Sequence, residues 1–86
     1  MQEYAGVTES SKLRWKCRRG MKELDIVLLH YLECHYPNAD GNKKLAFEKI
    51  LDMQDPELYF LVLKRISSDD KDIRDVVEIL HVTPRY

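Results

Sequence analysis

The sequence predicts an all-α fold, a compact bundle of five helices in a single domain that spans residues 1–86. The chain has 86 residues, of which 44% are hydrophobic and 34% are charged, so it is apolar enough to fold but large enough for only one core. Apolar residues recur at helical spacing in most segments, and turn-forming residues separate the segments at Gly20 and at residues 37–41, 54–56 and 67–70. This pattern predicts five helices joined by short turns.

The first segment, residues 11–19, is the most ambiguous of the five. Residues 12–18 alternate polar and apolar side chains as a half-buried strand would. No other segment offers a partner strand, and a lone strand leaves its backbone groups unpaired. We therefore expect a short helix that places Leu13 and Cys17 one turn apart and ends at Gly20.

The next two segments have the apolar periodicity of amphipathic helices. Residues 21–36 are expected to form the long central helix, with apolar positions at Leu24, Val27, Leu28, Tyr31 and Leu32. Residues 42–53 follow a turn and are expected to form a shorter helix, with apolar positions at Leu45, Phe47, Ile50 and Leu51.

Helix start signals define the last two segments. Asp55 followed by Pro56 predicts an N-cap with proline at the first helical position, and Ser67 or Ser68 can cap the final helix with Asp69 and Asp70 in its first turn. The expected inner faces are Leu58, Leu61, Val62 and Ile66 in the fourth helix and Ile73, Val76, Val77 and Leu80 in the fifth. We expect residues 1–10 and 82–86 to be flexible.

Overall charge and composition give no reason to expect a nucleic acid or a membrane as the partner. The net charge is −1, so nothing global favours nucleic acid or an acidic membrane. No window approaches the roughly 20 apolar residues of a membrane span, and residues 1–11 lack the features of a signal or transit peptide. We expect a cytoplasmic protein without membrane insertion, a monomer, whose two cysteines are reduced.

The sequence offers no catalytic or metal-binding signature. His30 and Cys34 lie four residues apart on one expected helix face, and His35 and Cys17 could approach them, but the paired C-x-x-C spacing of zinc sites is absent. Neither cysteine has a recognised catalytic partner nearby, and no phosphate-binding glycine motif is present. We expect no catalytic residue, no metal site and no enzymatic activity.

The strongest compositional feature is the basic run from Lys12 to Lys22, which contains Trp15. Cations around an aromatic residue suit a phosphate backbone or an acidic protein surface equally, so a nucleic-acid-binding regulator and an antitoxin-like protein adaptor are both alternatives. A solvated helix face is the ordinary explanation of such a run, and tryptophan is more often a core residue than a contact.

A specific string lies inside this run. Residues 13–25, LRWKCRRGMKELD, resemble the signature of the small succinate dehydrogenase FAD assembly factors, the flavinylation chaperones of bacteria and mitochondria. The centre of that signature is an R-G-x-x-E motif, which here starts at Arg19 and ends at Glu23. The resemblance continues at Asp55-Pro-Glu-Leu58.

The resemblance implies a five-helix fold and a function. Family members bind the flavoprotein subunit of succinate dehydrogenase, and in some bacteria that of fumarate reductase, and promote covalent attachment of FAD to a histidine of that subunit. A chaperone of this kind holds no cofactor stably itself, because FAD is attached in the partner. The partner-binding residues that the resemblance implies are Trp15, Arg18, Arg19, Gly20, Met21 and Glu23.

Each residue of the motif has an expected role. Gly20 joins two helices, so we expect a positive φ there and a close approach of the partner backbone. Arg19 offers a planar charged fork for oxygens of the partner. Glu23 is expected in the first turn of the long helix, where it could meet a cation or a polar group near the flavin.

Overall fold

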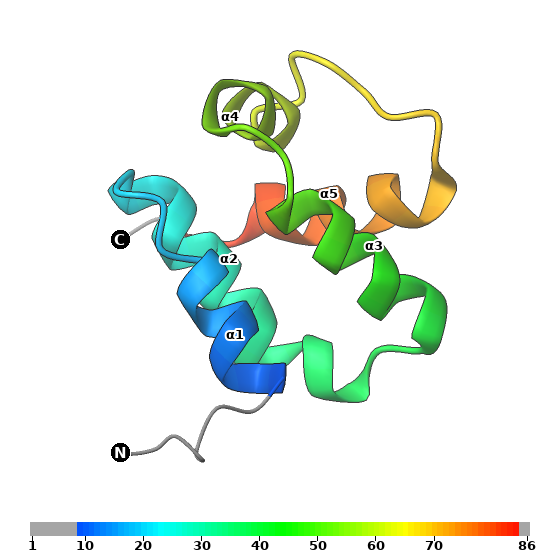
Figure 1. Cartoon of the computed structure of the whole chain (residues 1–86). Coiled ribbons are helices and arrows are strands. Elements are labelled where there is room, and N and C mark those ends of the chain that lie inside the picture. The colour runs from blue at the N-terminus through cyan, green and yellow to red at the C-terminus, as the bar shows by residue number, and fades with distance from the viewer. Residues whose placement is uncertain (1–8, 85–86) are drawn as a thin grey trace.

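The structure, a computed structural model, describes residues 9–84, and these residues form five α-helices and a short 3-10 helix (Figure 1). The all-α bundle predicted from the sequence is thereby confirmed. The helices are α1 (Glu9–Lys16), α2 (Lys22–Cys34), α3 (Gly41–Leu51), α4 (Asp55–Val62) and α5 (Lys71–Val82), with the 3-10 helix η2 (Tyr36–Asn38) between α2 and α3. No helix of the described range is long and apolar enough to cross a bilayer.

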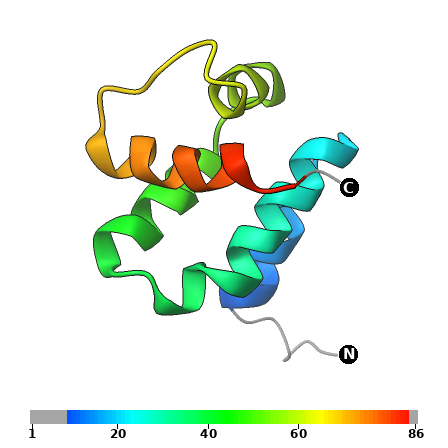
Figure 2. The same cartoon turned by 180° about the vertical axis from the view of Figure 1, so that it is seen from behind.

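Packing between helices follows their apolar faces. Helix α5 packs mainly on α3 and also touches α2 and α4, whereas α1 lies against α2 and α3. Figure 1 shows α1 in front of α2, with α4 above α3, and Figure 2, seen from the opposite side, shows α5 crossing in front of α3. The turns between α1 and α2 and between α3 and α4 are thus brought to the same end of the molecule, where Arg19 bonds to Met53.

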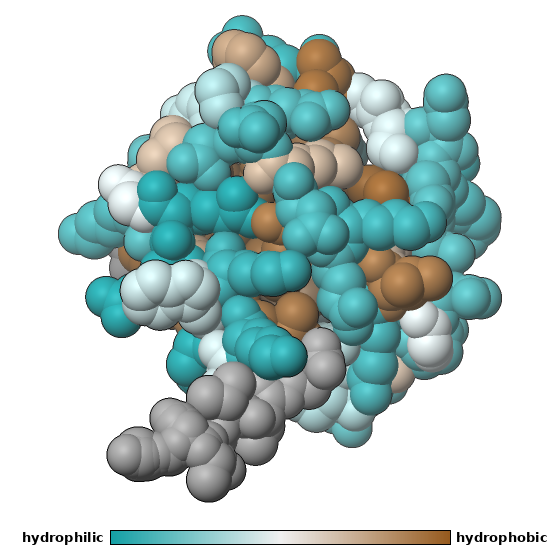
Figure 3. Space-filling view, in the orientation of Figure 1, coloured by the Kyte–Doolittle hydropathy of each residue, from teal (hydrophilic) through white to brown (hydrophobic). Residues whose placement is uncertain are grey.

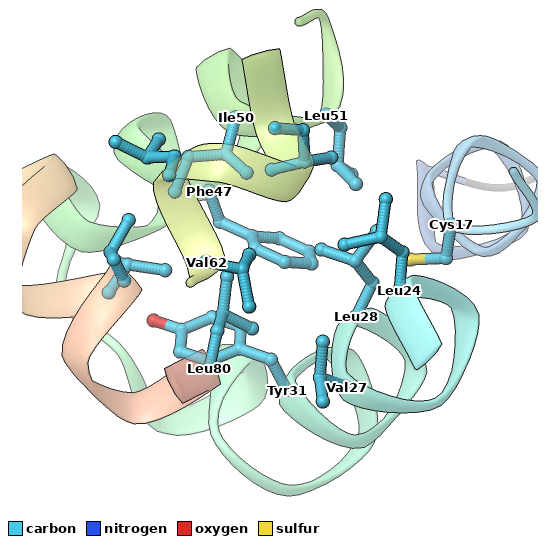
Figure 4. Close-up of a cluster of buried hydrophobic side chains, with 14 of the residues drawn as sticks. Cys17, Leu24, Val27, Leu28, Tyr31, Phe47, Ile50, Leu51, Val62 and Leu80 are labelled. Atoms are coloured by element: carbon cyan, nitrogen blue, oxygen red, sulfur yellow. The ribbon is translucent and has the colours of Figure 1, made fainter. Parts of the chain in front are cut away.

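The core draws side chains from all five helices. Phe47 of α3 points toward Leu28 of α2 (Figure 4), and both side chains are fully buried, as are Ile50 of α3 and Leu24 of α2. The expected apolar positions are buried in α2 and α5 without exception, but Leu45 and Ile66 are 53% and 43% exposed. On the face shown in Figure 3, polar side chains prevail and apolar ones form small separate patches.

Two helices begin at aspartates whose side chains cap them. The carboxylate of Asp40 accepts a hydrogen bond from the backbone N–H of Lys43 at 2.9 Å and starts α3. Asp70 accepts from the N–H groups of Asp72 and Ile73 at 2.8 and 3.3 Å and starts α5. The expectation of a serine cap at residues 67 or 68 is therefore wrong, because Asp70, which directly precedes the first turn of α5, takes the N-cap position.

Helix α4 differs from the sequence prediction at both ends. Its N-cap is Gln54 rather than Asp55, and Asp55 already lies inside the helix. At the other end, Lys64 adopts a left-handed φ of 62°, its N–H bonds to Leu61 O, and the Arg65 N–H bonds to Phe60 O. This is the Schellman pattern of a helix end, and it takes residue 66 out of the helix and into solvent.

Helix α5 continues through Val82 near the C-terminal end of the described chain. Val82 is still helical, and the hydroxyl of the buried Thr83 donates a hydrogen bond to the Ile79 carbonyl at 2.7 Å. Helix α1 likewise already includes residues 9 and 10. Whether residues 1–8 and 85–86 are flexible lies outside the described residues.

Candidate functional site

The motif residues lie in the turn between α1 and α2. Helix α1 ends at Lys16, three residues before the end expected from the sequence, and the N–H of Cys17 bonds to Leu13 O. Cys17 itself is fully buried, and this burial raises the pKa of its thiol to about 12, although the charges of Arg19 and Arg14 lower it. The chain then turns through residues 18–21, which means that the motif starts outside any helix.

Gly20 has the positive φ expected of it, +82°, which places it in the region that only glycine enters at low cost. It is exposed, and a Cβ built on it meets no heavy atom within 4 Å. Met21 follows as the N-cap residue of α2 and packs its half-buried side chain against the core. Backbone conformation rather than space therefore requires glycine at this turn.

We expect Gly20→Ala to lower the free energy of unfolding by about 1 kcal/mol, since an added Cβ is strained at a left-handed φ. Gly41→Ala is the matched control, because Gly41 also has open space around it but lies at the start of α3 without a positive φ. That control should leave stability unchanged or raise it slightly. Urea unfolding followed by circular dichroism measures both, and equal effects of the two substitutions would show that Gly20 is not strained by a side chain.

Arg19 points into the molecule instead of toward a partner. Its side chain is only 13% exposed, and its guanidinium donates to the carbonyl of Met53 at 2.9 Å and to the carboxylate of Asp55 at 3.1 Å. The second terminal nitrogen donates to the carbonyl of Leu51. The backbone N–H of Arg19 donates to Asp25 at 2.7 Å. The fork that we expected to meet a partner is thus already occupied within the chain.

These bonds join two turns that are more than 30 residues apart in the sequence. Leu51 is the last residue of α3, where backbone carbonyls lack partners within the helix, and Asp55 is the first residue of α4. The guanidinium satisfies carbonyls at the end of one helix and a carboxylate at the start of the next. Arg19 therefore fixes the turn at residues 17–21 against the turn at residues 52–54.

An open groove of about 600 Å³ lies along the junction of the two turns. One wall comes from the end of α1 and the turn after it, and the other from the segment between α3 and α4. The lining residues are Trp15, Lys16, Arg18 and Arg19 on the first wall and Leu51, Asp52, Met53, Gln54, Asp55 and Pro56 on the second. Because Arg19 ties both walls together, it also sets the shape of the groove.

Three of the candidate residues present their side chains to solvent at this end of the molecule. Trp15 is 74% exposed, so it does not take the core position that is more common for tryptophan. Arg18 and Glu23 are exposed as well, and Glu23 lies in the first turn of α2 as predicted. Neither side chain forms a hydrogen bond or ion pair with another residue in the range 9–84. They are available to a partner in a way that Arg19 is not.

The basic run is partly neutralised within the chain. Arg14 pairs with Glu33 at 2.8 Å and Lys16 with Asp52 at 3.1 Å, both on the surface, where such pairs contribute little stability. Arg19 pairs with Asp55, and the remaining cations of the run, Lys12, Arg18 and Lys22, have no ion-pair partner among the residues that the structure describes. The run is therefore not a continuous basic stripe of the kind that follows a phosphate backbone.

The histidines and cysteines are not brought together as a metal site would require. The Sγ atom of Cys34 lies 3.8 Å from Nδ1 of His30, while His35 stacks on Tyr31 and Cys17 is buried in the core. Among residues 9–84, no three such side chains are placed to share a metal ion. Cys34 is a free, exposed thiol.

Sequence reasoning missed the residues that hold Arg19, namely Asp25, Leu51 and Met53. Leu51 and Met53 act through their backbone carbonyls, which every residue has, so the residue type does not indicate this role. The carboxylates gave a usable signal, because Asp25 and Asp55 both lie in the two strings, 13–25 and 55–58, that carried the family resemblance.

Comparisons with known proteins identify the family of this chain. A family model described as "Flavinator of succinate dehydrogenase" matches residues 11–83. The FAD assembly factor SdhE of Coxiella burnetii is 38% identical over 68 residues, which cover 79% of this chain and 83% of that protein. That of Pseudomonas aeruginosa is 33% identical over 76 residues, which cover 88% and 90%. No solved structure matches. Because the family match spans most of the chain and includes both turns, this protein belongs to the flavinator of succinate dehydrogenase family.

Proposed function

We propose that this chain is an assembly factor that binds the flavoprotein subunit of succinate dehydrogenase and promotes covalent attachment of FAD to it. The observation that carries the proposal is the family match over residues 11–83, which covers every helix that builds the groove. The names of the relatives, FAD assembly factors, support the same function. The flavoprotein subunit of fumarate reductase is a second partner in this proposal.

The proposed docking surface is the exposed part of the α1–α2 turn together with the first turn of α2. Its contact residues are Trp15, Arg18, Gly20 and Glu23, and Arg19 and Met21 hold them in place from within the chain. The bonds of Arg19 to the turn at residues 52–54 restrain this turn and so limit its alternative conformations. Restrained groups of this kind bind a partner without a large cost in conformational entropy.

In this proposal the bond-forming chemistry belongs to FAD and to a histidine of the partner subunit. The chain contributes binding and orientation, as protein around a cofactor generally does, and acts as a chaperone rather than an enzyme. It holds no FAD stably and works as a monomer in the cytoplasm. The free charges of Arg18 and Glu23 are the groups that orient the partner.

Reconstitution with purified proteins tests this function. The apo flavoprotein subunit is incubated with FAD, with and without this chain, and covalent flavin is measured as in-gel fluorescence after denaturation. We expect covalent flavin to accumulate faster by about tenfold or more when the chain is present, and to be reduced in cells from which its gene is deleted. Equal fluorescence in both the reconstitution and the deletion strain would contradict the proposal.

A further inference from the structure

The most unusual surface feature of the molecule is the indole of Trp15. It is 74% exposed, the most exposed of the five large hydrophobic side chains that reach the surface between residues 11 and 84. Trp15 lies in the last turn of α1, where Leu13 and Cys17 turn inward and are buried. Helix α1 has only eight residues and buries few side chains. Folding nevertheless leaves its tryptophan, the largest side chain of the protein, in water.

The indole lies between two hollows of the surface. On one side is the groove of about 600 Å³ at the junction of the two turns. On the other is a smaller, apolar depression of about 400 Å³ beside Ser11, Lys12 and Lys16. A partner surface that receives the indole would therefore also fill concave surface on both sides of it, and such central, well-packed aromatic side chains provide most of the binding energy in many interfaces.

The charges around Trp15 are unbalanced toward the positive. In the groove, Asp52 and Asp55 are paired with Lys16 and Arg19, so their carboxylates are neutralised. Lys12, Arg18 and Lys22 remain without an ion-pair partner among the described residues. The carboxylates without one in the same stretch are Glu23 and Asp25, and Asp25 accepts the backbone N–H of Arg19 at 2.7 Å. Charge complementarity then favours a partner surface that carries carboxylates.

We propose that Trp15 is the anchor of the docking surface and that the partner receives its indole in an apolar pocket rimmed by acidic side chains. This inference rests on the proposed function and specifies the chemistry of the surface on the flavoprotein subunit. Arg18 meets the acidic rim next to the indole, and Lys12 and Lys22 lie farther along it. The acidic rim of the partner ends where it faces Glu23 of this chain, because Glu23 would repel further carboxylates of the partner.

Binding measurements with substituted chains test the anchor. Trp15→Ala should weaken binding of the purified flavoprotein subunit by about 30-fold or more, the loss typical of an interface hot spot, while thermal unfolding stays unchanged. The matched control is Val82→Ala on α5, which removes another exposed apolar side chain (65% exposed) and should change binding by less than about twofold. Unchanged binding of Trp15→Ala would overturn the anchor.

The acidic rim is tested by charge reversal. Arg18→Glu should weaken binding by about tenfold or more at low salt and remove most of its salt dependence, whereas Arg65→Glu, the same change in the loop after α4, should not. If Arg18→Glu binds as tightly as Arg65→Glu does, the partner surface is not acidic at this position and the proposal fails.

The single tryptophan of the chain provides a direct probe of the bound state. With 5-fluorotryptophan incorporated, the one ¹⁹F signal should shift when the flavoprotein subunit is added. A shift on self-association or on addition of duplex DNA, without one on addition of the subunit, would identify a different occupant and overturn the inference. Absence of any binding by the unsubstituted chain would contradict the proposed function itself, and with it the anchor, whereas normal binding with an unmoved signal contradicts the anchor alone.

Discussion

Replacing Arg19 with methionine is expected to lower the free energy of unfolding by about 3 kcal/mol, the largest stability effect of any substitution considered for this protein. Methionine fills much of the same volume but donates no hydrogen bond. The carbonyls of Leu51 and Met53 would then lose their partner in a nearly buried place, and Asp55 would lose its countercharge. Each unsatisfied buried group costs about 1–3 kcal/mol, less where water can enter.

Urea and thermal unfolding measure this change, which corresponds to a decrease in Tm on the order of 15 °C for a domain of this size. Arg14→Met is the matched control, because Arg14 is an arginine close to Arg19 in the sequence that forms its ion pair in solvent. Its partner is Glu33, and about half of each side chain is exposed. That control should change stability by less than about 1 kcal/mol. If the two substitutions cost the same, Arg19 does not clamp the two turns.

The clamp also shows which parts of the site the sequence could not predict. An arginine beside a glycine in a basic run is typical of a partner-facing group, and residue type alone favours that role. Its real partners lie 32 to 36 residues away and include two backbone carbonyls. A contact of this kind depends on the packing of α1 against α3, which local patterns do not contain.

The exposure of Trp15, in contrast, could be predicted from the spacing of residues around the axis of a helix. Residues of an α-helix are about 100° apart around its axis, so Leu13 and Cys17 share one face and Trp15 lies on nearly the opposite face. The general preference of tryptophan for the core rests on residue type and does not take this geometry into account. The same spacing argument succeeded for α5, where all four predicted apolar positions are buried.

Helix ends were the least predictable part of the fold. The stretch from Ser67 to Asp70 contains four residues that can each cap a helix, and only the burial of Ile73 against the core selects Asp70. The end of α4 is set by Lys64 in a left-handed conformation that lysine rarely adopts. Neither choice follows from propensity, because tertiary packing decides both.

Glu23→Ala should reduce function strongly while leaving the fold intact. Glu23 is exposed in the first turn of α2 and has no partner in residues 9–84, so its loss should change the free energy of unfolding by no more than about 1 kcal/mol, the scale of a helix-dipole interaction. If its carboxylate meets a cation or a polar group of the flavoprotein subunit, binding should weaken by about tenfold or more. Covalent flavin formation should fall in proportion.

Glu57→Ala is the control that separates the two effects. Glu57 is an exposed glutamate in the first turn of α4 and does not line the groove, so its removal changes the same charge in the same turn of a helix. Both variants should unfold at nearly the same temperature, and only Glu23→Ala should lose affinity in a titration against the subunit. A Glu23→Ala protein that binds and supports flavinylation as well as Glu57→Ala does would mean that the first turn of α2 is not part of the docking surface, even if the anchor at Trp15 is correct.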